Sequence, residues 1–290
     1  MSTLHTVMLV DGMALLFRAY YASAYSGYIK RTSSGMPTNA VHGFVKYWTE
    51  AIAKFRPSHV VCCWDMGSST FRTERYPDYK GNREAPPDDL IPQFDLVKEV
   101  VAVFGVPNIG LAGYEADDCI GTLARRFSEE GANVLVLTGD HDLLQIVSER
   151  VTVIVMKKGV SNYAVYDEAA LLEERGLTPR QIVELKGLTG DASDNYPGVK
   201  GIGEKTALKL LAEYGTIDGI LENLSALSKS VRAKIEADMD MLLLSRELAE
   251  IRRDVPVDCA LESCIWSPDL HRVREMFEQL EFKGLARQIG

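Results

Sequence analysis

Residues 6–12 have the sequence TVMLVDG, in which an uncharged run ends in Asp-Gly. Apolar side chains then recur with helical spacing at Leu15, Leu16 and Tyr20. A short apolar run followed by a helical period is typical of a buried strand that leads into a helix. This stretch therefore predicts the first strand–helix unit of an α/β fold.

The same pattern returns along the chain. Further apolar runs predict strands at residues 59–64, 133–137 and 151–155. Amphipathic helices are expected between the strands, at 41–55, 93–104 and 117–130. Fully apolar strands that alternate with helices are typical of a mostly parallel sheet with helices on both faces.

Aspartates follow three of the predicted strands. Asp11, Asp65 and Asp140 each stand at or just beyond the end of an apolar run. Ligands bind beyond the carboxyl ends of the strands in such sheets, because the connecting loops converge there. The three carboxylates are therefore expected along one edge. Arg18, on the helix after Asp11, would return to the same face and could reach a phosphate bound beside these carboxylates.

The chain of 290 residues is long enough for a large domain with a smaller attached module. Residues 1–178 are assigned to the α/β domain, in which the segment 66–92 interrupts the alternation of strands and helices. Residues 179–290 form the predicted helical module, which includes the closing C-terminal helices. Its helices are expected at 179–189, 204–214, 216–223, 230–250 and 269–280.

Composition limits the class of protein. No apolar run is long enough to cross a bilayer, so no membrane partner is expected. The five cysteines form no CxxC pair, which favours buried, reduced thiols in a cytoplasmic protein. A net charge of −9 is unusual for a nucleic-acid enzyme, which normally carries an excess of Lys and Arg.

Nine carboxylates are the most informative group in the sequence. They are Asp11, Asp65, Glu115, Asp117, Asp118, Asp140, Asp142, Asp191 and Asp194. Oxygen-only clusters without His or Cys favour Mg²⁺ or Mn²⁺, and two such ions about 4 Å apart can clamp a phosphodiester. The nine charges equal the net charge of −9, so the rest of the chain is neutral on balance.

Local geometry determines which carboxylates share a face. In a regular helix Asp117 points away from Glu115 and Asp118, so it joins them only if Glu115 precedes the first helical turn. Asp-x-Asp at 140–142 shares a face in an extended chain, and Asp-x-x-Asp at 191–194 does so across a helical turn. Taken singly, each carboxylate could instead cap a helix or complement its dipole.

Residues 196–207, YPGVKGIGEKTA, combine a Gly-x-Gly turn with the start of a helix. Backbone amides at a helix N-terminus bind phosphate readily, and a helix-hairpin-helix turn holds the DNA backbone without reading bases. Any tight interhelical turn could use Gly-x-Gly, but here lysines and apolar packing residues flank it. The residues expected to bind DNA are Lys200, Gly201, Ile202, Gly203, Lys205 and Thr206.

The segment 66–92 interleaves basic and aromatic side chains, among them Arg72, Tyr79, Lys80 and Arg83. Such alternation can stack bases and hold the phosphates of a single strand, although a solvated loop is the simpler alternative. Arg72 and Tyr79 are expected to contact DNA.

These motifs, in this order, resemble the bacterial flap endonuclease family, the same module as the 5′ nuclease domain of bacterial DNA polymerase I. The matching segments lie at 9–12, 64–72, 79–83, 113–118, 138–142, 188–195 and 197–207. The resemblance implies a PIN-like α/β fold with a helical arch near 66–92 and a helix-hairpin-helix at 188–211. It also implies a metal-dependent 5′ nuclease that cuts DNA at 5′ flap junctions and duplex 5′ ends during replication and repair.

The resemblance further implies roles for individual residues. Two Mg²⁺ or Mn²⁺ ions are implied, the first among Asp11, Asp65, Glu115 and Asp117 with Asp118 close by, the second among Asp140, Asp142, Asp191 and Asp194. Lys80 and Arg83, at the base of the arch, are implied to contact the scissile phosphate. Main-chain oxygens at Gly201, Ile202 and Gly203 are implied to hold a K⁺ ion that contacts downstream duplex.

Two alternatives share part of this pattern. A ribonuclease of the PIN-like fold would have the acidic edge but lack the duplex-binding hairpin. A non-catalytic protein that binds branched DNA would not need an intact set of carboxylates. We expect a monomer that acts on branched DNA with a 5′ flap and on duplex DNA.

Overall fold

The computed structural model describes residues 5–25, 27, 29–159 and 161–288. At its centre lies a six-stranded sheet with the strand order β3-β2-β1-β4-β5-β6. The strands are β1 (Thr6–Asp11), β2 (His59–Cys63), β3 (Asn108–Ile109), β4 (Asn133–Thr138), β5 (Val151–Met156) and β6 (Tyr163–Tyr166). Neighbouring strands are parallel except for β6, which runs antiparallel to β5. The prediction of a mostly parallel sheet is confirmed.

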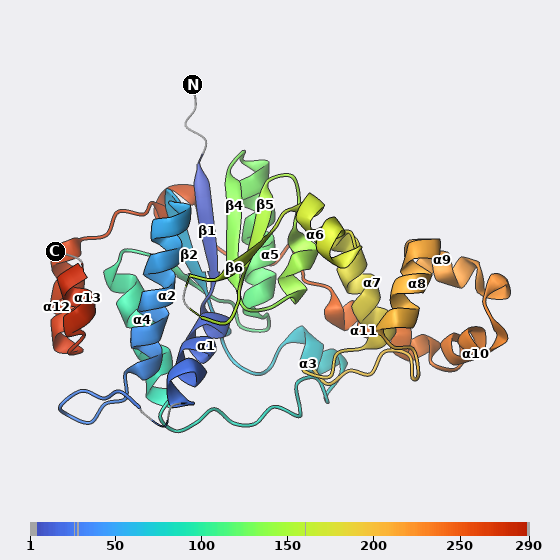
Figure 1. Cartoon of the computed structure of the whole chain (residues 1–290), viewed down its shortest axis with the longest axis horizontal. Helices are drawn as coiled ribbons and strands as arrows, with labels where there is room; N and C mark the ends of the chain where they lie inside the picture. Colours follow the sequence, from blue (N-terminus) through green and yellow to red (C-terminus); the bar gives the residue numbers. More distant parts are fainter. Residues whose placement is uncertain (1–4, 26, 28, 160, 289–290) are drawn as a thin grey trace.

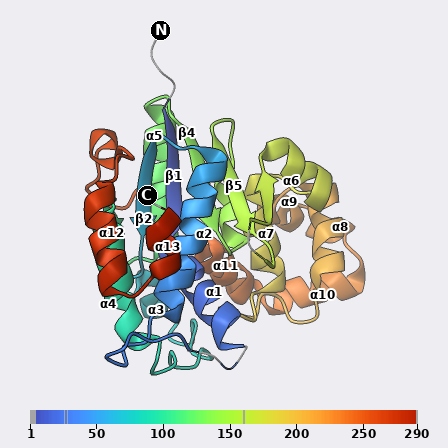
Figure 2. The ribbon, with the colours of Figure 1, turned by 60° about the vertical axis from the view of Figure 1, so that its left-hand side comes forward.

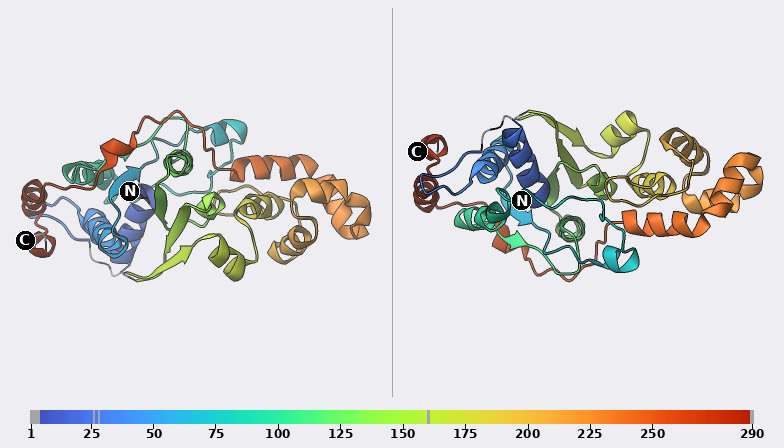
Figure 3. Two further views of the ribbon diagram at one scale, coloured as in Figure 1. Left: turned by 90° about the horizontal axis from the view of Figure 1, so that it is seen from above. Right: turned by 90° about the horizontal axis from the view of Figure 1, so that it is seen from below.

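Helices cover both faces of this sheet (Figures 1 and 3). They are α1 (Gly12–Ala24), α2 (Asn39–Phe55) and α4 (Ile91–Val103) on one face and α5 (Ala116–Glu129) on the other. The first strand shows why both faces need cover, since successive side chains of a strand point to opposite sides. Val7 and Leu9 pack with α5, whereas Met8 and Val10 pack with α1 and α2.

The helical module lies beyond the β6 edge, after α6 (Glu168–Arg175) (Figure 1). Its helices are α7 (Pro179–Thr189), α8 (Glu204–Tyr214), α9 (Ile217–Glu222), α10 (Lys229–Ala237) and α11 (Met239–Ala249). The single helix expected over 230–250 is therefore two helices. Asp238 breaks it with φ −115° and ψ 27°, and its carboxylate accepts the main-chain N–H of Lys200 at 2.8 Å. The break thus supports the hairpin turn.

The chain after α11 returns to the α/β domain. It runs along α5, where Arg126 donates to the carbonyl of Val257 at 2.8 Å. α12 (Leu270–Gln279) and α13 (Lys283–Gln288) then pack beside α2 and α4, with Phe277 buried in that core (Figure 2). The closing helices, expected in the second module, therefore cover the first domain. An amphipathic period reveals an apolar face but not the surface that it covers.

The segment expected to form a helical arch is mostly irregular. Within 66–92, α3 (Phe71–Arg75) and the start of α4 are helical, whereas residues 76–90 form turns and irregular chain. Pro86 and Pro87 lack the main-chain N–H that a helix interior requires. The predicted excursion exists, but residues 76–90 form an irregular segment, here called the strap, whose Lys80 and Arg83 contact Glu115 and Asp194.

All five cysteines are buried and none forms a disulfide. Over the residues that the structure describes, no helix has the length and apolar character needed to cross a bilayer.

Candidate metal and DNA-binding site

Asp11 lies at the carboxyl end of β1, in the middle of the sheet edge. Its carboxylate accepts the main-chain N–H of Ala14 at 3.0 Å and the hydroxyl of Thr138 at 2.8 Å. Burial, together with the charges of Asp65 and Asp140, raises the pKa of Asp11 to about 7. The three strand-end aspartates therefore lie close enough to interact, as their positions in the sequence predicted.

The turn before α5 brings Glu115 and Asp117 to the same edge. Glu115 is the N-cap of α5 and has an extended backbone, with φ −92° and ψ 163°. It therefore precedes the first helical turn, which is the condition under which Asp117 can join it. Burial and the charges of Asp11 and other carboxylates raise the pKa of Asp117. Asp65 accepts the main-chain N–H of Ala116 at 2.7 Å and so lies against the same turn.

Asp118 and Arg72 form a buried ion pair that corrects two predictions. Two guanidinium nitrogens of Arg72 donate to the two oxygens of Asp118 at 2.8 and 2.9 Å. Arg72 is 2% exposed and Asp118 is 0% exposed. Asp118 also accepts the main-chain N–H groups of Glu115 and Arg252. Asp118 is thus a structural partner rather than an open metal ligand, and Arg72 faces protein rather than DNA.

Tyr79 is a second residue of the 66–92 segment that faces inward. Its side chain is 4% exposed, and its ring stacks on that of Tyr196 with centroids 6.3 Å apart. Its hydroxyl lies 2.9 Å from Asp194 and 3.2 Å from Glu115. Tyr79 therefore links the two carboxylate groups from inside the protein, and the predicted DNA contact does not fit this position.

Lys80 and Arg83 reach the carboxylates from the turn after α3. The ammonium of Lys80 lies 2.6 Å from Glu115, and the guanidinium of Arg83 lies 2.7 Å from Asp194. Lys80 has a left-handed backbone, φ 55°, and its main-chain N–H donates to the carbonyl of Asp194 at 2.8 Å. Asn195, with φ 61°, donates its side-chain amide back to the strap at 2.7 Å. These contacts hold the strap against the loop that follows α7.

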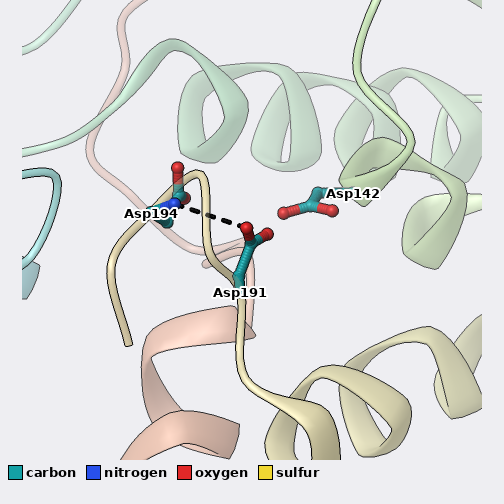
Figure 4. Close-up of side chains that lie close together, drawn as sticks. All are labelled: Asp142, Asp191 and Asp194. Carbon is teal, nitrogen blue, oxygen red and sulfur yellow. Dashed lines mark hydrogen bonds between the residues drawn. The ribbon is translucent and has the colours of Figure 1, made fainter. Parts of the chain in front are cut away.

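Asp142, Asp191 and Asp194 form a close carboxylate group (Figure 4). Each offers one oxygen, and these three oxygens lie within 4.8 Å of one another. The local chain differs from the prediction, because Asp142 begins the 3-10 helix η1 (Asp142–Ile146) and residues 191–194 form a turn. Asp140 is also near, since it accepts the main-chain N–H of Asp142 at 2.9 Å.

Lys186 is a site residue that the sequence pattern did not reveal. Its ammonium contacts Asp142 at 2.6 Å and also contacts Asp191. Burial and the charge of Asp140 raise the pKa of Asp142 to about 7. Burial also acts to raise the pKa of Asp191, but hydrogen bonds from Lys186 and Ser193 overcome this and lower it to about 2. A lysine near the end of an amphipathic helix is usually solvated, so the position of Lys186 in the sequence did not indicate that it belongs to the site.

Arg18 lies at the border of the site. It lines a cleft of about 470 Å³ together with Asp140 and Asp142. Its guanidinium donates to the carbonyls of Met156, at 3.3 Å, and Lys157. Arg18 thus returns to the predicted face, although main-chain oxygens hold its charge. A larger cavity, of about 840 Å³, contains none of the predicted site residues.

The predicted hairpin forms the turn between α7 and α8. Its anchors Val199 and Ile202 are buried, so the side chain of Ile202 packs in the core and is not available to DNA. The residues that stay accessible are Lys200, Gly201, Gly203 and Lys205, with Thr206 half-buried. Gly203 is the N-cap of α8, where backbone amides favour a phosphate. The carbonyl of Gly201 accepts a bond from Lys234 at 2.9 Å, so a K⁺ ion would share this oxygen with an ammonium.

The donor set at the sheet edge suits hard divalent cations. All the gathered donors are carboxylate oxygens, which favour Mg²⁺ or Mn²⁺. The raised pKa values of Asp11, Asp117 and Asp142 reflect burial and like charge, which a divalent cation would offset. The residues present therefore fit such ions.

Two family models match the sequence over most of its length. They are described as "5′-3′ exonuclease, N-terminal resolvase-like domain", over residues 6–176, and "5′-3′ exonuclease, C-terminal SAM fold", over residues 177–271. The chain is 51% identical over 283 residues to the 5′-3′ exonuclease of Bacillus subtilis (strain 168), covering 98% of this chain and 95% of that protein. It is 40% identical over 285 residues to DNA polymerase I of Bacillus caldotenax, covering 98% of this chain but 32% of that protein.

Solved structures share the fold at lower sequence identity. A structure described as "Divalent metal ions (zinc) bound to T5 5′-exonuclease" has a TM-score of 0.70 and 20% identity, covering 98% of both chains. The catalytic core of Rad2 in complex with DNA substrate has a TM-score of 0.64 and 19% identity, covering 99% of this chain and 91% of that one.

Proposed function

This chain belongs to the 5′-3′ exonuclease family, and we propose that it hydrolyses phosphodiester bonds of DNA at 5′ flap junctions and at duplex 5′ ends. The observation that supports this proposal most strongly is the meeting of two carboxylate groups beside Lys80 and Arg83. Negative groups that hold cations and positive groups that hold phosphate are thereby brought to one edge of the sheet.

We assign the two divalent ions to separate carboxylate groups. One Mg²⁺ or Mn²⁺ is assigned to Asp11, Asp65, Glu115 and Asp117, and the other to Asp140, Asp142, Asp191 and Asp194. When bound, such ions neutralise charge on the phosphate and acidify water so that it can attack at neutral pH. The protein orients the ligands, as Thr138 does for Asp11 at 2.8 Å and Ser193 does for Asp191 at 2.7 Å.

Lys80 and Arg83 are the groups that we assign to the scissile phosphate. Each now pairs with a carboxylate, Lys80 with Glu115 and Arg83 with Asp194. A phosphate offers oxygens to the same ammonium and guanidinium, so it can exchange into these pairs without a large movement of the strap. The scissile bond is then oriented beside the carboxylates, where charge develops during hydrolysis.

The hairpin supplies the second contact with DNA. Lys200 and Lys205 are exposed beside the glycine-capped start of α8, which suits the backbone of a duplex rather than its bases. The potassium ion expected there stays a prediction, with Lys234 as a neighbour of the carbonyl of Gly201. The fixed separation between hairpin and carboxylates would select the bond that is cut.

One chain supplies every assigned ligand and both DNA contacts, so we propose that it acts as a monomer. The hairpin argues against a ribonuclease of the PIN-like fold. The complete set of carboxylates argues against a protein that only binds branched DNA. Roles in DNA replication and repair follow from the substrate class and stay a prediction.

A cleavage assay tests the proposed function. A 5′-labelled flap substrate is titrated with Mg²⁺ at fixed enzyme, and product lengths are read on a gel, with EDTA and a 3′ flap of equal length as controls. We expect Mg²⁺-dependent cuts at the 5′ junction and none on the 3′ flap. Asp142→Ala should abolish cleavage while flap binding persists. If this variant cut at the wild-type rate, the assignment of the second divalent ion to the group that contains Asp142 would be wrong.

A further inference from the structure

Lys186 is placed between two carboxylates that we assign to the second divalent ion. It lies in the last turn of α7, and its side chain is 25% exposed. The ammonium contacts Asp142 at 2.6 Å and also contacts Asp191. Its positive charge therefore lies inside the group of carboxylates that we assign to a divalent cation.

The two oxygens of Asp191 are used differently. Oδ1 accepts the main-chain N–H and the hydroxyl of Ser193, both at 2.7 Å, and so closes the turn that carries Asp194. Oδ2 is the oxygen that contacts Lys186. A cation that binds at Asp191 without opening the turn must therefore share or take the oxygen that Lys186 holds.

A side chain of Lys186 that leaves Asp142 and Asp191 can move into an adjacent cleft. Lys186 lines the cleft of about 470 Å³ that is also bordered by Arg18, Asp140 and Asp142. This cleft opens beside the carboxylates, where the proposed function brings a DNA phosphate. An ammonium on a flexible four-carbon stem can turn from a carboxylate to a phosphate without movement of α7.

We propose that Lys186 is a tethered cation that holds Asp142 and Asp191 together, yields them to the second divalent ion, and then contacts a phosphate of the bound DNA. This inference rests on the proposed function, because it presumes the second ion. Ion and ammonium compete for the same oxygens, so the bare protein binds the ion more weakly than its carboxylates alone would allow. Phosphate binding by the freed ammonium favours the ion-bound arrangement, which couples ion and substrate at this group.

The test is a calorimetric titration of DNA-free protein with Mn²⁺, supported by the electron paramagnetic resonance signal of free Mn²⁺. The ion at the second group is identified as the one lost in Asp142→Asn. Lys186→Met and Lys186→Gln should each bind this ion about tenfold more tightly than wild type, because a charge-assisted bond no longer competes. Lys186→Arg should retain the wild-type affinity to within about twofold.

Arg18→Met is the matched control. It removes one positive charge from the wall of the same cleft, but main-chain carbonyls, not carboxylates, hold that charge. If Arg18→Met and Lys186→Met increased the affinity for Mn²⁺ equally, the effect would come from the loss of any nearby positive charge. That result would overturn the proposal. Unchanged or weaker Mn²⁺ binding in both Lys186→Met and Lys186→Gln would overturn it as well.

The same data separate this inference from the proposed function. If wild-type protein binds no ion that Asp142→Asn removes, the proposed second ion fails and the role of Lys186 fails with it. If that ion binds but its affinity does not change when Lys186 is replaced, only the inference about Lys186 fails. A further result is expected with flap DNA and Ca²⁺, where loss of one phosphate contact in Lys186→Met lowers the salt slope of binding by about 0.9.

Discussion

Replacing Arg72 by methionine should destabilise the protein far more than a surface substitution on the same helix. The change removes both hydrogen bonds to Asp118, at 2.8 and 2.9 Å, and the bonds to the carbonyls of Leu248 and Glu250, at 2.9 Å each. Asp118 is left 0% exposed with no cation beside it. Only the main-chain N–H groups that it already accepts would still stabilise its charge.

Removal of one partner of a buried ion pair typically costs about 3–5 kcal/mol. The total stability of a domain is about 5–15 kcal/mol, so we expect a large shift in the denaturation midpoint. The measurement is guanidinium chloride unfolding at neutral pH, followed by circular dichroism. The double variant Arg72→Met/Asp118→Leu should recover part of the loss, because it no longer leaves a buried charge unpaired.

Arg75→Met, one turn of α3 further on, is the control. Arg75 pairs with Glu247 at 3.1 Å, but the two side chains are 59% and 44% exposed. Pairs exposed to this extent contribute about 0–1 kcal/mol. If Arg72→Met lowered the free energy of unfolding no more than Arg75→Met does, the Arg72–Asp118 pair would not provide the stability expected of a buried ion pair.

Three further predictions concern DNA binding, chemistry and pH. Lys80→Ala should slow single-turnover cleavage more than it weakens flap binding, and an unchanged rate would remove Lys80 from the scissile phosphate. Lys205→Ala should reduce the salt slope of duplex binding by about 0.9 for one lost phosphate contact, with little change in the rate at saturating DNA; an unaltered slope would contradict the hairpin contact. Burial and the charges of Lys30 and Lys46 lower the pKa of His42 to about 4, against about 6.5 in an unfolded chain. Between these values the unfolded chain takes up a proton that the folded one does not, so stability should fall as pH drops from about 6.5 to about 4. His42→Gln should flatten that decline, and identical slopes in denaturation at several pH values would rule out this role.

Strand ends were the part of the site that the sequence predicted well. Apolar runs locate strands that are buried on both faces. Asp11 is the last residue of β1, and Asp65 and Asp140 stand two residues beyond the ends of β2 and β4. The backbone then determines where their side chains meet. Glu115 precedes the first turn of α5, and this is the arrangement in which Asp117 can reach the same edge.

Side chains from the basic segment were harder to predict, because their partners are remote in the chain. Arg72 is paired with Asp118, 46 residues away, and no local pattern separates this pair from a solvated arginine. Tyr79 likewise contacts Asp194, 115 residues away. Both residues were predicted to contact DNA from the composition of their segment. The tertiary structure instead buries Arg72 and Tyr79 against carboxylates of the protein.

The periodicity of the sequence also could not predict where a helix packs or where a very short strand lies. The amphipathic pattern of α12 predicted a helix correctly but not that it returns to the first domain, where Phe277 is buried. β3 has two residues, too few for a period to appear. The helix expected over 230–250 was divided by Asp238, whose carboxylate supports the hairpin at Lys200.

The proposed reaction depends most on paired divalent ions held by carboxylates from distant segments beside a DNA phosphate. The most direct measurement is anomalous diffraction at the manganese edge from crystals of the protein with a 5′-flap DNA and Mn²⁺. We predict two peaks, one bordered by Asp11 and Asp117 and one bordered by Asp142 and Asp191, with a DNA phosphate next to both. Peaks at other surfaces, or a phosphate remote from these carboxylates, would contradict it.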